Sequence, residues 1–271
     1  MTTDNVTLAA LQQVKRDGRK IAAVVAYDYE IAQIVDRAGV DLVSVGDSVG
    51  VNVWGHGSQR EVTLDQMTLV CRVRRGVTRA LVSCDLPFGA LQQDPDAAVD
   101  AARRLVTQGG ADLIKLDGAS SCPDVLGAIV RAGIPVWAQF GIAPHTADGG
   151  LKTAAAAVDA VTNDRLVREA TLLEDAGAAM LDFTNSGPVT GPEVVRAVRI
   201  PVLGGLGGGP WLDGRIRSVV AAIGYSASAL DDPTPRYANV AETTLQAIQA
   251  FCADVRAARQ IRGSAPAAPT R

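Results

Sequence analysis

The chain has 271 residues and is 48% hydrophobic, which fits one large α/β barrel or two small domains. Its 26 basic and 29 acidic residues give a formal net charge of −3, which argues against a nucleic-acid-binding protein. No uninterrupted apolar run approaches about 18 residues, and the N-terminus lacks a signal-peptide pattern, so we expect no membrane contact.

One pattern recurs along the chain: a helical stretch ends in a small-residue turn, and a run rich in β-branched residues follows at once. Glycine just past a helix end is the expected left-handed cap, so each turn marks where a strand begins. The instances lie at residues 37–47, 108–118, 131–141, 175–185 and 198–207, and two further strands fit at 21–27 and 79–86. Residues 64–76 and 164–177, between strands, carry helical periodicity.

Strands that alternate with helices imply right-handed βαβ units and a parallel sheet. Seven or eight such units over about 200 residues favour a closed (β/α)₈ barrel over an open sheet. Because no linker divides the chain, we predict a single barrel domain at 1–262, which ends in a helix at 237–261. We expect the tail at 263–271 to be disordered. The four cysteines have no CxxC spacing, which favours a reduced, cytoplasmic protein.

Three acidic residues follow apolar runs where strands are predicted to end: Asp47, Asp85 and Asp117. The C-terminal ends of strands form the working face of a parallel α/β protein, so these side chains should converge. Carboxylates from separate strands can share one divalent cation such as Mg²⁺, which prefers oxygen ligands. Lys115 precedes Asp117 by two residues and therefore points to the same face of its strand. One cation, these acids and a lysine would suit a small anionic substrate such as a 2-oxo acid.

Several segments, in order, resemble the ketopantoate hydroxymethyltransferase family: AYDYEIAQIVDRAGVDLVSVGDSVG, VTLDQM, CDLPFGA, IKLDG and IPVLGGLGGGPWLDGRI. The likeness runs from about residue 20 to residue 240. The resemblance implies a (β/α)₈ barrel of the phosphoenolpyruvate/pyruvate-binding type and a role in pantothenate biosynthesis. It further implies Mg²⁺, a branched 2-oxo acid substrate, 5,10-methylenetetrahydrofolate as the one-carbon cosubstrate, and a homo-oligomer.

Carried over by position, the resemblance assigns a role to each residue of the acidic group. Asp47 and Asp85 would bind the metal, and Asp117 occupies the site of a family glutamate near the metal. Ser48 would contact the substrate, and Lys115 would hold its carboxylate.

The substrate side departs from the family pattern. The family base is a glutamate late in the sixth strand, but aligning on AGA places Thr184 at that position. Threonine cannot act unaided as a base at neutral pH. In the loop of the fifth strand, Gln139 and His145 stand where the family has histidine and glutamine. We hypothesise that His145 or Asp182, two residues before Thr184 on the same strand face, carries proton transfer.

The sequence leaves three functions open. The first is Mg²⁺-dependent hydroxymethyl transfer to a small branched 2-oxo acid through an enolate. The second is a divergent lyase, hydrolase or mutase that acts on a 2-oxo acid through the same chemistry. The third is a catalytically silent barrel, against which the retained Asp47, Asp85 and Lys115 argue.

Overall fold

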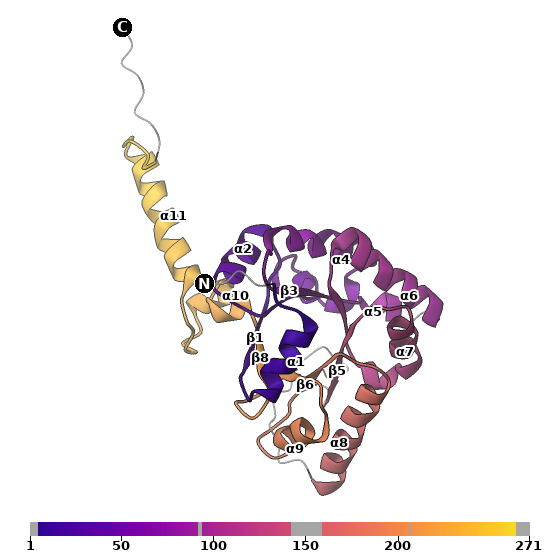
Figure 1. Ribbon diagram of the computed structural model, residues 1–271. Helices are drawn as coiled ribbons and strands as arrows, with labels where there is room; N and C mark the ends of the chain where they lie inside the picture. Colours follow the sequence, from indigo (N-terminus) through magenta and orange to yellow (C-terminus); the bar gives the residue numbers. More distant parts are fainter. Residues whose placement is uncertain (1–4, 92–93, 142–158, 206, 264–271) are drawn as a thin grey trace. The chain divides into compact units, whose positions relative to one another are not determined.

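In a computed structural model of the protein, residues 5–91, 94–141, 159–205 and 207–263 are described. The chain divides into two compact units, Met1–Arg217 and Ser218–Arg271. The first unit contains a ring of parallel strands surrounded by helices (Figure 1). We keep the single barrel domain at 1–262 as a proposal, and most of the tail at 263–271 lies outside the described residues.

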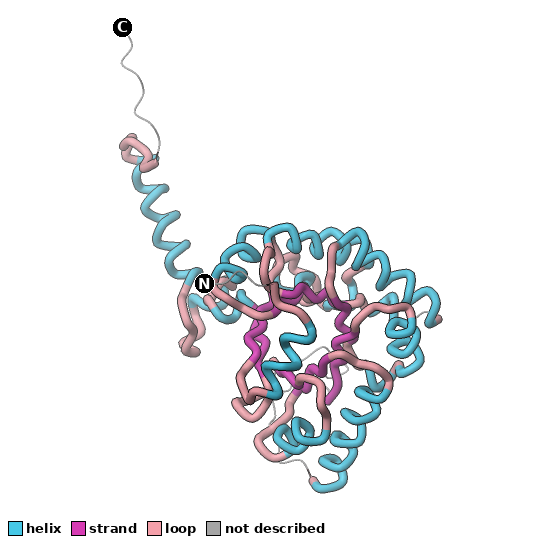
Figure 2. Tube along the Cα trace, in the orientation of Figure 1, coloured by secondary structure: helices cyan, strands magenta, loops and turns pink. Residues whose placement is uncertain are grey.

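Eight strands within the described residues pair in chain order and close into a barrel (Figure 2). They are β1 (Ile21–Val25), β2 (Leu42–Val45), β3 (Leu81–Asp85), β4 (Leu113–Leu116), β5 (Val136–Gly141), β6 (Met180–Thr184), β7 (Val202–Gly204) and β8 (Gly214–Ser218). The predicted (β/α)₈ fold is therefore confirmed.

The helices alternate with the strands, as the sequence pattern predicts. They are α1 (Leu8–Arg16), α2 (Tyr29–Arg37), α3 (Val49–Asn52), α4 (Leu64–Val70), α5 (Phe88–Leu91), α6 (Pro95–Arg104), α7 (Pro123–Arg131), α8 (Ala160–Asp175), α9 (Thr190–Ala197), α10 (Val219–Ala222) and α11 (Val240–Arg256). Helix α11 corresponds to the predicted terminal helix, and the Asn239 side chain caps its start by accepting a hydrogen bond from Glu242 N–H. No described helix is both long and apolar enough to cross a membrane.

The eighth strand was not predicted, and its sequence shows why. In Gly214–Ser218 the exposed Arg215 and Arg217 alternate with the buried Gly214 and Ile216. The strand therefore has no run of apolar residues, and the periodicity that marks the other seven strands is missing. It follows Asp213, whose carboxylate accepts from Val202 N–H on β7 at 2.9 Å.

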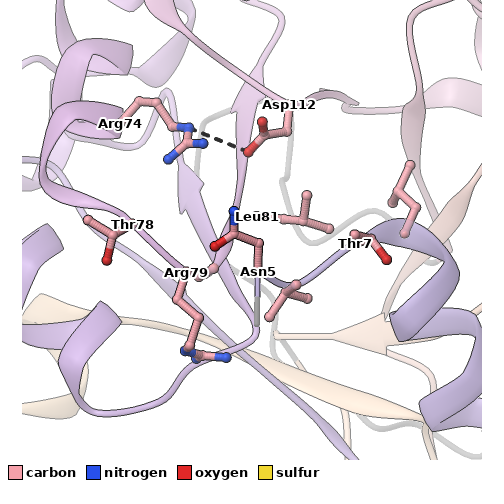
Figure 3. Close-up of a pocket in the computed structure, with 10 residues that line it drawn as sticks. Asn5, Thr7, Arg74, Thr78, Arg79, Leu81 and Asp112 are labelled. Carbon is pink, nitrogen blue, oxygen red and sulfur yellow. Dashed lines mark ion pairs between the residues drawn. The ribbon is translucent and has the colours of Figure 1, made fainter. Parts of the chain in front are cut away.

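A cavity of about 340 Å³ lies at the N-terminal end of the barrel, beside the segment before α1 and the segment that leads into β3 (Figure 3). Arg74 and Asp112 line it, with Arg74 Nε 3.6 Å from Asp112 Oδ2. Residues at this end contribute to stability rather than to chemistry, because the reacting groups of such barrels lie at the other end.

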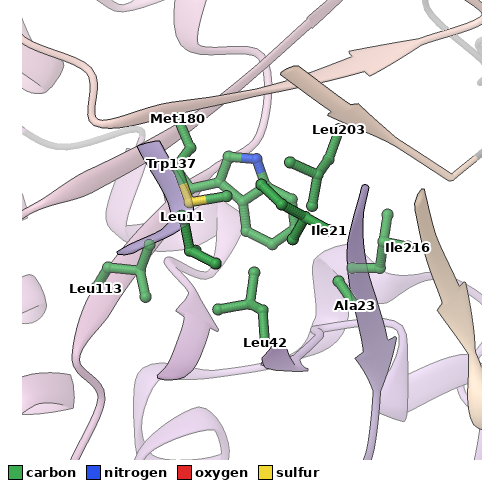
Figure 4. Close-up of a cluster of buried hydrophobic side chains, with 9 residues drawn as sticks. All are labelled: Leu11, Ile21, Ala23, Leu42, Leu113, Trp137, Met180, Leu203 and Ile216. Atoms are coloured by element: carbon green, nitrogen blue, oxygen red, sulfur yellow. The ribbon is translucent and has the colours of Figure 1, made fainter. Parts of the chain in front are cut away.

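Apolar side chains fill the barrel just above this end and close it to water. Trp137 is fully buried and packs with Leu11 of α1 (Figure 4). The remaining members come from the strands: Ile21, Ala23, Leu42, Leu113, Met180, Leu203 and Ile216. Inward-facing residues nearer the C-terminal ends are polar, and Ser83 Oγ donates to Ser44 Oγ at 2.9 Å between β3 and β2. The barrel interior thus changes from an apolar base to a polar upper part.

Candidate active site

Three carboxylates meet at the C-terminal end of the barrel. Asp85 is the last residue of β3, while Asp47 and Asp117 follow β2 and β4 by two residues and one residue. An oxygen from each lies within 4.8 Å of the others. Asp47 is 6% exposed and Asp85 is 5% exposed, so water screens their charges poorly. Such a group of hard oxygen donors can hold a divalent cation.

The turn after β2 brings Asp47 against Asp85. The backbone N–H of Asp47 donates to Asp85 Oδ2 at 3.2 Å. A Cβ at Gly46 would lie 2.8 Å from Ser48 Oγ and 3.2 Å from Val25 Cγ1, so only glycine lets the chain pass here without displacement. The glycine before Asp47 therefore leaves room for the Ser48 hydroxyl and the Val25 side chain beside the turn.

Lys115 joins the acids into one charged cluster. Its Nζ lies 3.7 Å from Asp85 Oδ1 and 3.7 Å from Asp182 Oδ2, and it also hydrogen-bonds Asp117. The ammonium stands 6.0 Å from the centre of the Trp137 ring, which forms part of the apolar base of the barrel. One buried cation is thus shared among carboxylates from three strands.

The pKa values in the cluster depart from their ordinary range because the groups are buried together. Burial, reinforced by Asp85 and Asp117, raises the pKa of Asp47 to about 8. Burial also raises the pKa of Asp85 to about 7, although Lys115 opposes this rise. Burial alone would lower the pKa of Lys115, but the adjacent carboxylates more than offset it and hold the ammonium charged.

Asp182 belongs to this cluster, whereas Thr184 lies one pleat higher on β6. Strand β6 continues through Thr184, which is 3% exposed. Asp182 pairs in register with Gln139 on β5, and Gln139 Nε2 donates to Asp182 Oδ2 at 3.4 Å. Asp182 Oδ1 is buried without a hydrogen-bond partner among the described residues. Burial raises the pKa of Asp182 against the opposing charge of Lys115.

Ser48 lies beside the acids in a chain of hydroxyl and amide groups. Tyr27 Oη is 3.0 Å from Ser48 Oγ, and Asn52 Nδ2 donates to Tyr27 Oη at 2.9 Å. Sequence reasoning did not find Tyr27 or Asn52, and the AYDY motif was the available signal for the tyrosine. The hydrogen bonds from Asn52 through Tyr27 fix the position of the Ser48 hydroxyl next to Asp47.

The structure therefore brings most of the sequence-predicted site residues together. His145 lies outside the described residues. The residues found at this end of the barrel are Asp47, Ser48, Asp85, Lys115, Asp117, Gln139, Asp182 and Thr184.

The fold and this site define a (β/α)₈ enzyme with an acidic centre at the C-terminal ends of its strands. A family model of ketopantoate hydroxymethyltransferase matches residues 5–260, and the chain belongs to this family. It is 39% identical over 256 residues to the 3-methyl-2-oxobutanoate hydroxymethyltransferase of Cyanothece sp., covering 93% of this chain and 96% of the relative. It is 37% identical over 252 residues to the enzyme of the same name from Salinibacter ruber, covering 93% and 95%. The predicted family and enzyme class are confirmed.

Solved structures with the same fold have little sequence in common with the chain. A putative phosphonomutase from Burkholderia cenocepacia has a TM-score of 0.62 at 18% identity, with coverage of 93% of this chain and 98% of the other. A 2,3-dimethylmalate lyase of the phosphoenolpyruvate mutase/isocitrate lyase superfamily has a TM-score of 0.60 at 13% identity, with coverage of 96% and 90%. These similarities agree with the (β/α)₈ fold of the chain.

Proposed function

We propose that the protein catalyses Mg²⁺-dependent hydroxymethyl transfer to a small branched 2-oxo acid, with 5,10-methylenetetrahydrofolate as the one-carbon donor. The proposal depends on one observation above the others. Asp47, Asp85 and Asp117 gather within 4.8 Å at the C-terminal end of the barrel, in a chain that belongs to the hydroxymethyltransferase family.

The donor atoms of the cluster fit Mg²⁺. They are carboxylate oxygens from three strands, and Asp85 Oδ1 is buried without a hydrogen-bond partner among the described residues. A buried acceptor in that state requires a ligand or a proton. Asp47, Asp85 and Asp117 would hold the ion, directly or through water. When bound, the cation supplies stabilisation for negative charge that develops on a substrate carbonyl oxygen.

Lys115 would bind the carboxylate of the 2-oxo acid. The surrounding carboxylates keep its ammonium charged, and its position beside Asp85 places that charge next to the proposed cation site. Ser48, held by Tyr27, would donate a hydrogen bond to the same substrate. These contacts would orient the substrate before any proton moves.

Asp182 would accept the proton from C3 of the substrate. Its Oδ1 is buried without a hydrogen-bond partner among the described residues, and Gln139 holds the other oxygen. The electrons of the C3–H bond would move toward the carbonyl, and C3 would then form a bond to the methylene carbon of the carrier. Both carbon–nitrogen bonds of that methylene group break, one water molecule supplies the hydroxyl oxygen, and each of the two carrier nitrogens takes a proton. Thr184 lacks a group that can take the proton at neutral pH. His145 is the other candidate.

The experiment is exchange of the C3 proton of 3-methyl-2-oxobutanoate for deuterium, followed by NMR with and without Mg²⁺ and without folate. We expect Mg²⁺-dependent exchange, and folate-dependent formation of the hydroxymethyl product when the donor is added. If neither exchange nor product forms under any condition, the proposed function is wrong.

A divergent lyase, hydrolase or mutase acting on a 2-oxo acid is the second candidate. The observation that favours it is Thr184 at the end of β6, the position at which the sequence resemblance places the family base, beside the acids that follow β2, β3 and β4. Mg²⁺-dependent exchange without any folate-dependent product would support this candidate over hydroxymethyl transfer.

A further inference from the structure

A second cavity, of about 570 Å³, opens between two loops and a helix of the barrel. The first loop region, residues 60–64, follows β2 and ends at the first residue of α4. The second, residues 87–90, follows β3 and includes most of the short helix α5. The helix is α6. The proposed function gives it no role. Its volume lies within the range typical of small-molecule sites.

This cavity lies on the same side of the barrel as the acid cluster. Pro87 in its wall follows Asp85 by two residues. Val62 in its wall packs on α3, since a Cβ at Gly50 would lie 2.6 Å from Val62 Cγ2. The cavity of Figure 3 is at the opposite end of the strands and cannot serve a ligand that reacts at the acids.

The lining combines an apolar wall with one available cation. Val62, Leu64, Pro87 and Ala90 contribute the apolar surface. Arg60 stacks its guanidinium 4.5 Å from the centre of the Phe88 ring. A guanidinium held on an aromatic face keeps its N–H edge available to a carboxylate.

The other charged groups of the lining are already paired. Glu61 accepts from Ser58 N–H at 2.8 Å within a capping box. Asp100 pairs with Arg103, and Arg104 pairs with Asp65. Among the described residues, no carboxylate forms an ion pair with Arg60. Arg60 is therefore the cation of the lining that has no ion-pair partner among the described residues and can contact an anionic ligand.

A large second substrate has to reach the acids from the loops at the C-terminal ends of the strands, and this cavity lies among those loops. Asp85, Lys115 and Asp182 are each 5–6% exposed, so the barrel interior has little room beyond a small acid. We propose that the cavity binds the carboxylate-bearing aryl part of the one-carbon carrier, with Arg60 against a carboxylate. This inference rests on the proposed function, which requires such a carrier.

The probe is p-aminobenzoylglutamate, which carries the aryl ring and carboxylates but no pterin, titrated calorimetrically into the Mg²⁺-loaded enzyme. We expect Arg60→Gln to weaken binding about tenfold, because it removes a charge-assisted hydrogen bond. Gly89→Leu should narrow the cavity, because Gly89 lines it and a Cβ at this position meets no atom within 4 Å; circular dichroism checks that the variant is folded. Arg168→Gln, which removes an exposed charge on α8, is the matched control.

Binding that is equal in the wild type, Arg60→Gln and Gly89→Leu, or no binding to the wild type, would overturn the proposal. Loss in both cavity variants with retention in Arg168→Gln would support it. The C3 exchange experiment needs no carrier, so its failure would remove the proposed function while this titration still reports on the cavity.

Discussion

Lys115 Nζ on β4 lies 3.7 Å from Asp182 Oδ2 on β6, across the interior of the barrel. A carboxylate from β6 therefore belongs to the acid cluster. It lies one pleat below Thr184, the residue that aligns with the family base. The separation of two residues along a strand is roughly 6–7 Å. The long lysine side chain makes the deeper carboxylate part of the same site.

Asp182→Asn should lower the rate of C3 proton exchange about 10²–10⁴-fold, because it removes a positioned base. Thr184→Val should have a much smaller effect, since its hydroxyl cannot take the proton. The double variant Asp182→Asn with Thr184→Glu places a carboxylate where the resemblance puts the family base and should exchange faster than Asp182→Asn alone. NMR of the C3 proton in deuterated buffer measures all three. Wild-type exchange in Asp182→Asn would move the base to His145 or to water.

Asp47→Asn and Asp85→Asn should each weaken Mg²⁺ binding by at least about tenfold, because Mg²⁺ sites use few protein ligands. Both side chains are buried, and the change from carboxylate to amide keeps their shape, so the barrel should remain folded. Calorimetric titration with Mg²⁺ measures the affinity, and circular dichroism checks the fold. Asp17→Asn, at an exposed acid, is the control. Unchanged affinity in either variant would remove that residue from the metal site.

Stabilisation by Mg²⁺ should increase with pH. The pKa values of about 8 for Asp47 and about 7 for Asp85 exceed the ordinary 3.8, so the folded metal-free protein binds more protons than the unfolded chain. The contribution of these two carboxyl groups to the free energy of unfolding of the metal-free protein therefore falls as pH rises from about 4 toward 8. Mg²⁺ takes the place of those protons. The rise in Tm with saturating Mg²⁺, measured between about pH 5.5 and 8.5, should therefore grow. A rise in Tm that is constant or shrinks over this range would contradict the metal assignment.

Lys115→Met should weaken binding of the 2-oxo acid about tenfold or more while Mg²⁺ affinity does not fall. The substitution removes the charge that would pair with the substrate carboxylate, and it also removes a cation that competes with the metal for Asp85 and Asp117. Sequential titration with Mg²⁺ and then 3-methyl-2-oxobutanoate separates the two affinities. Lys20→Met, at a lysine of the opposite end that donates to Leu212 O, is the control. Unchanged affinity for the 2-oxo acid would remove Lys115 from the substrate site.

Most of the barrel could be predicted from local sequence, because a glycine turn followed by a β-branched run marks most of its strands. The convergence of Asp47, Asp85 and Asp117 followed from the rule that parallel strands end on one face. The eighth strand could not be predicted, because Arg215 and Arg217 interrupt its apolar pattern. That Asp182 belongs to the acid cluster could not be predicted either. Its contact with the cluster depends on how far the Lys115 side chain extends across the barrel, and no local sequence pattern indicates that distance.

The packing of α1 on the apolar base of the barrel has a consequence for folding during synthesis. Lys15 Nζ of α1 donates to Val195 O at 3.0 Å and to Ile200 O at 2.9 Å, and it lies 2.9 Å from Asp213 Oδ2. These partners are synthesised long after the lysine. In a nascent chain, α1 therefore cannot form these contacts until the segments around the last two strands have left the ribosome. Until then the apolar face of α1 is exposed and prone to aggregation.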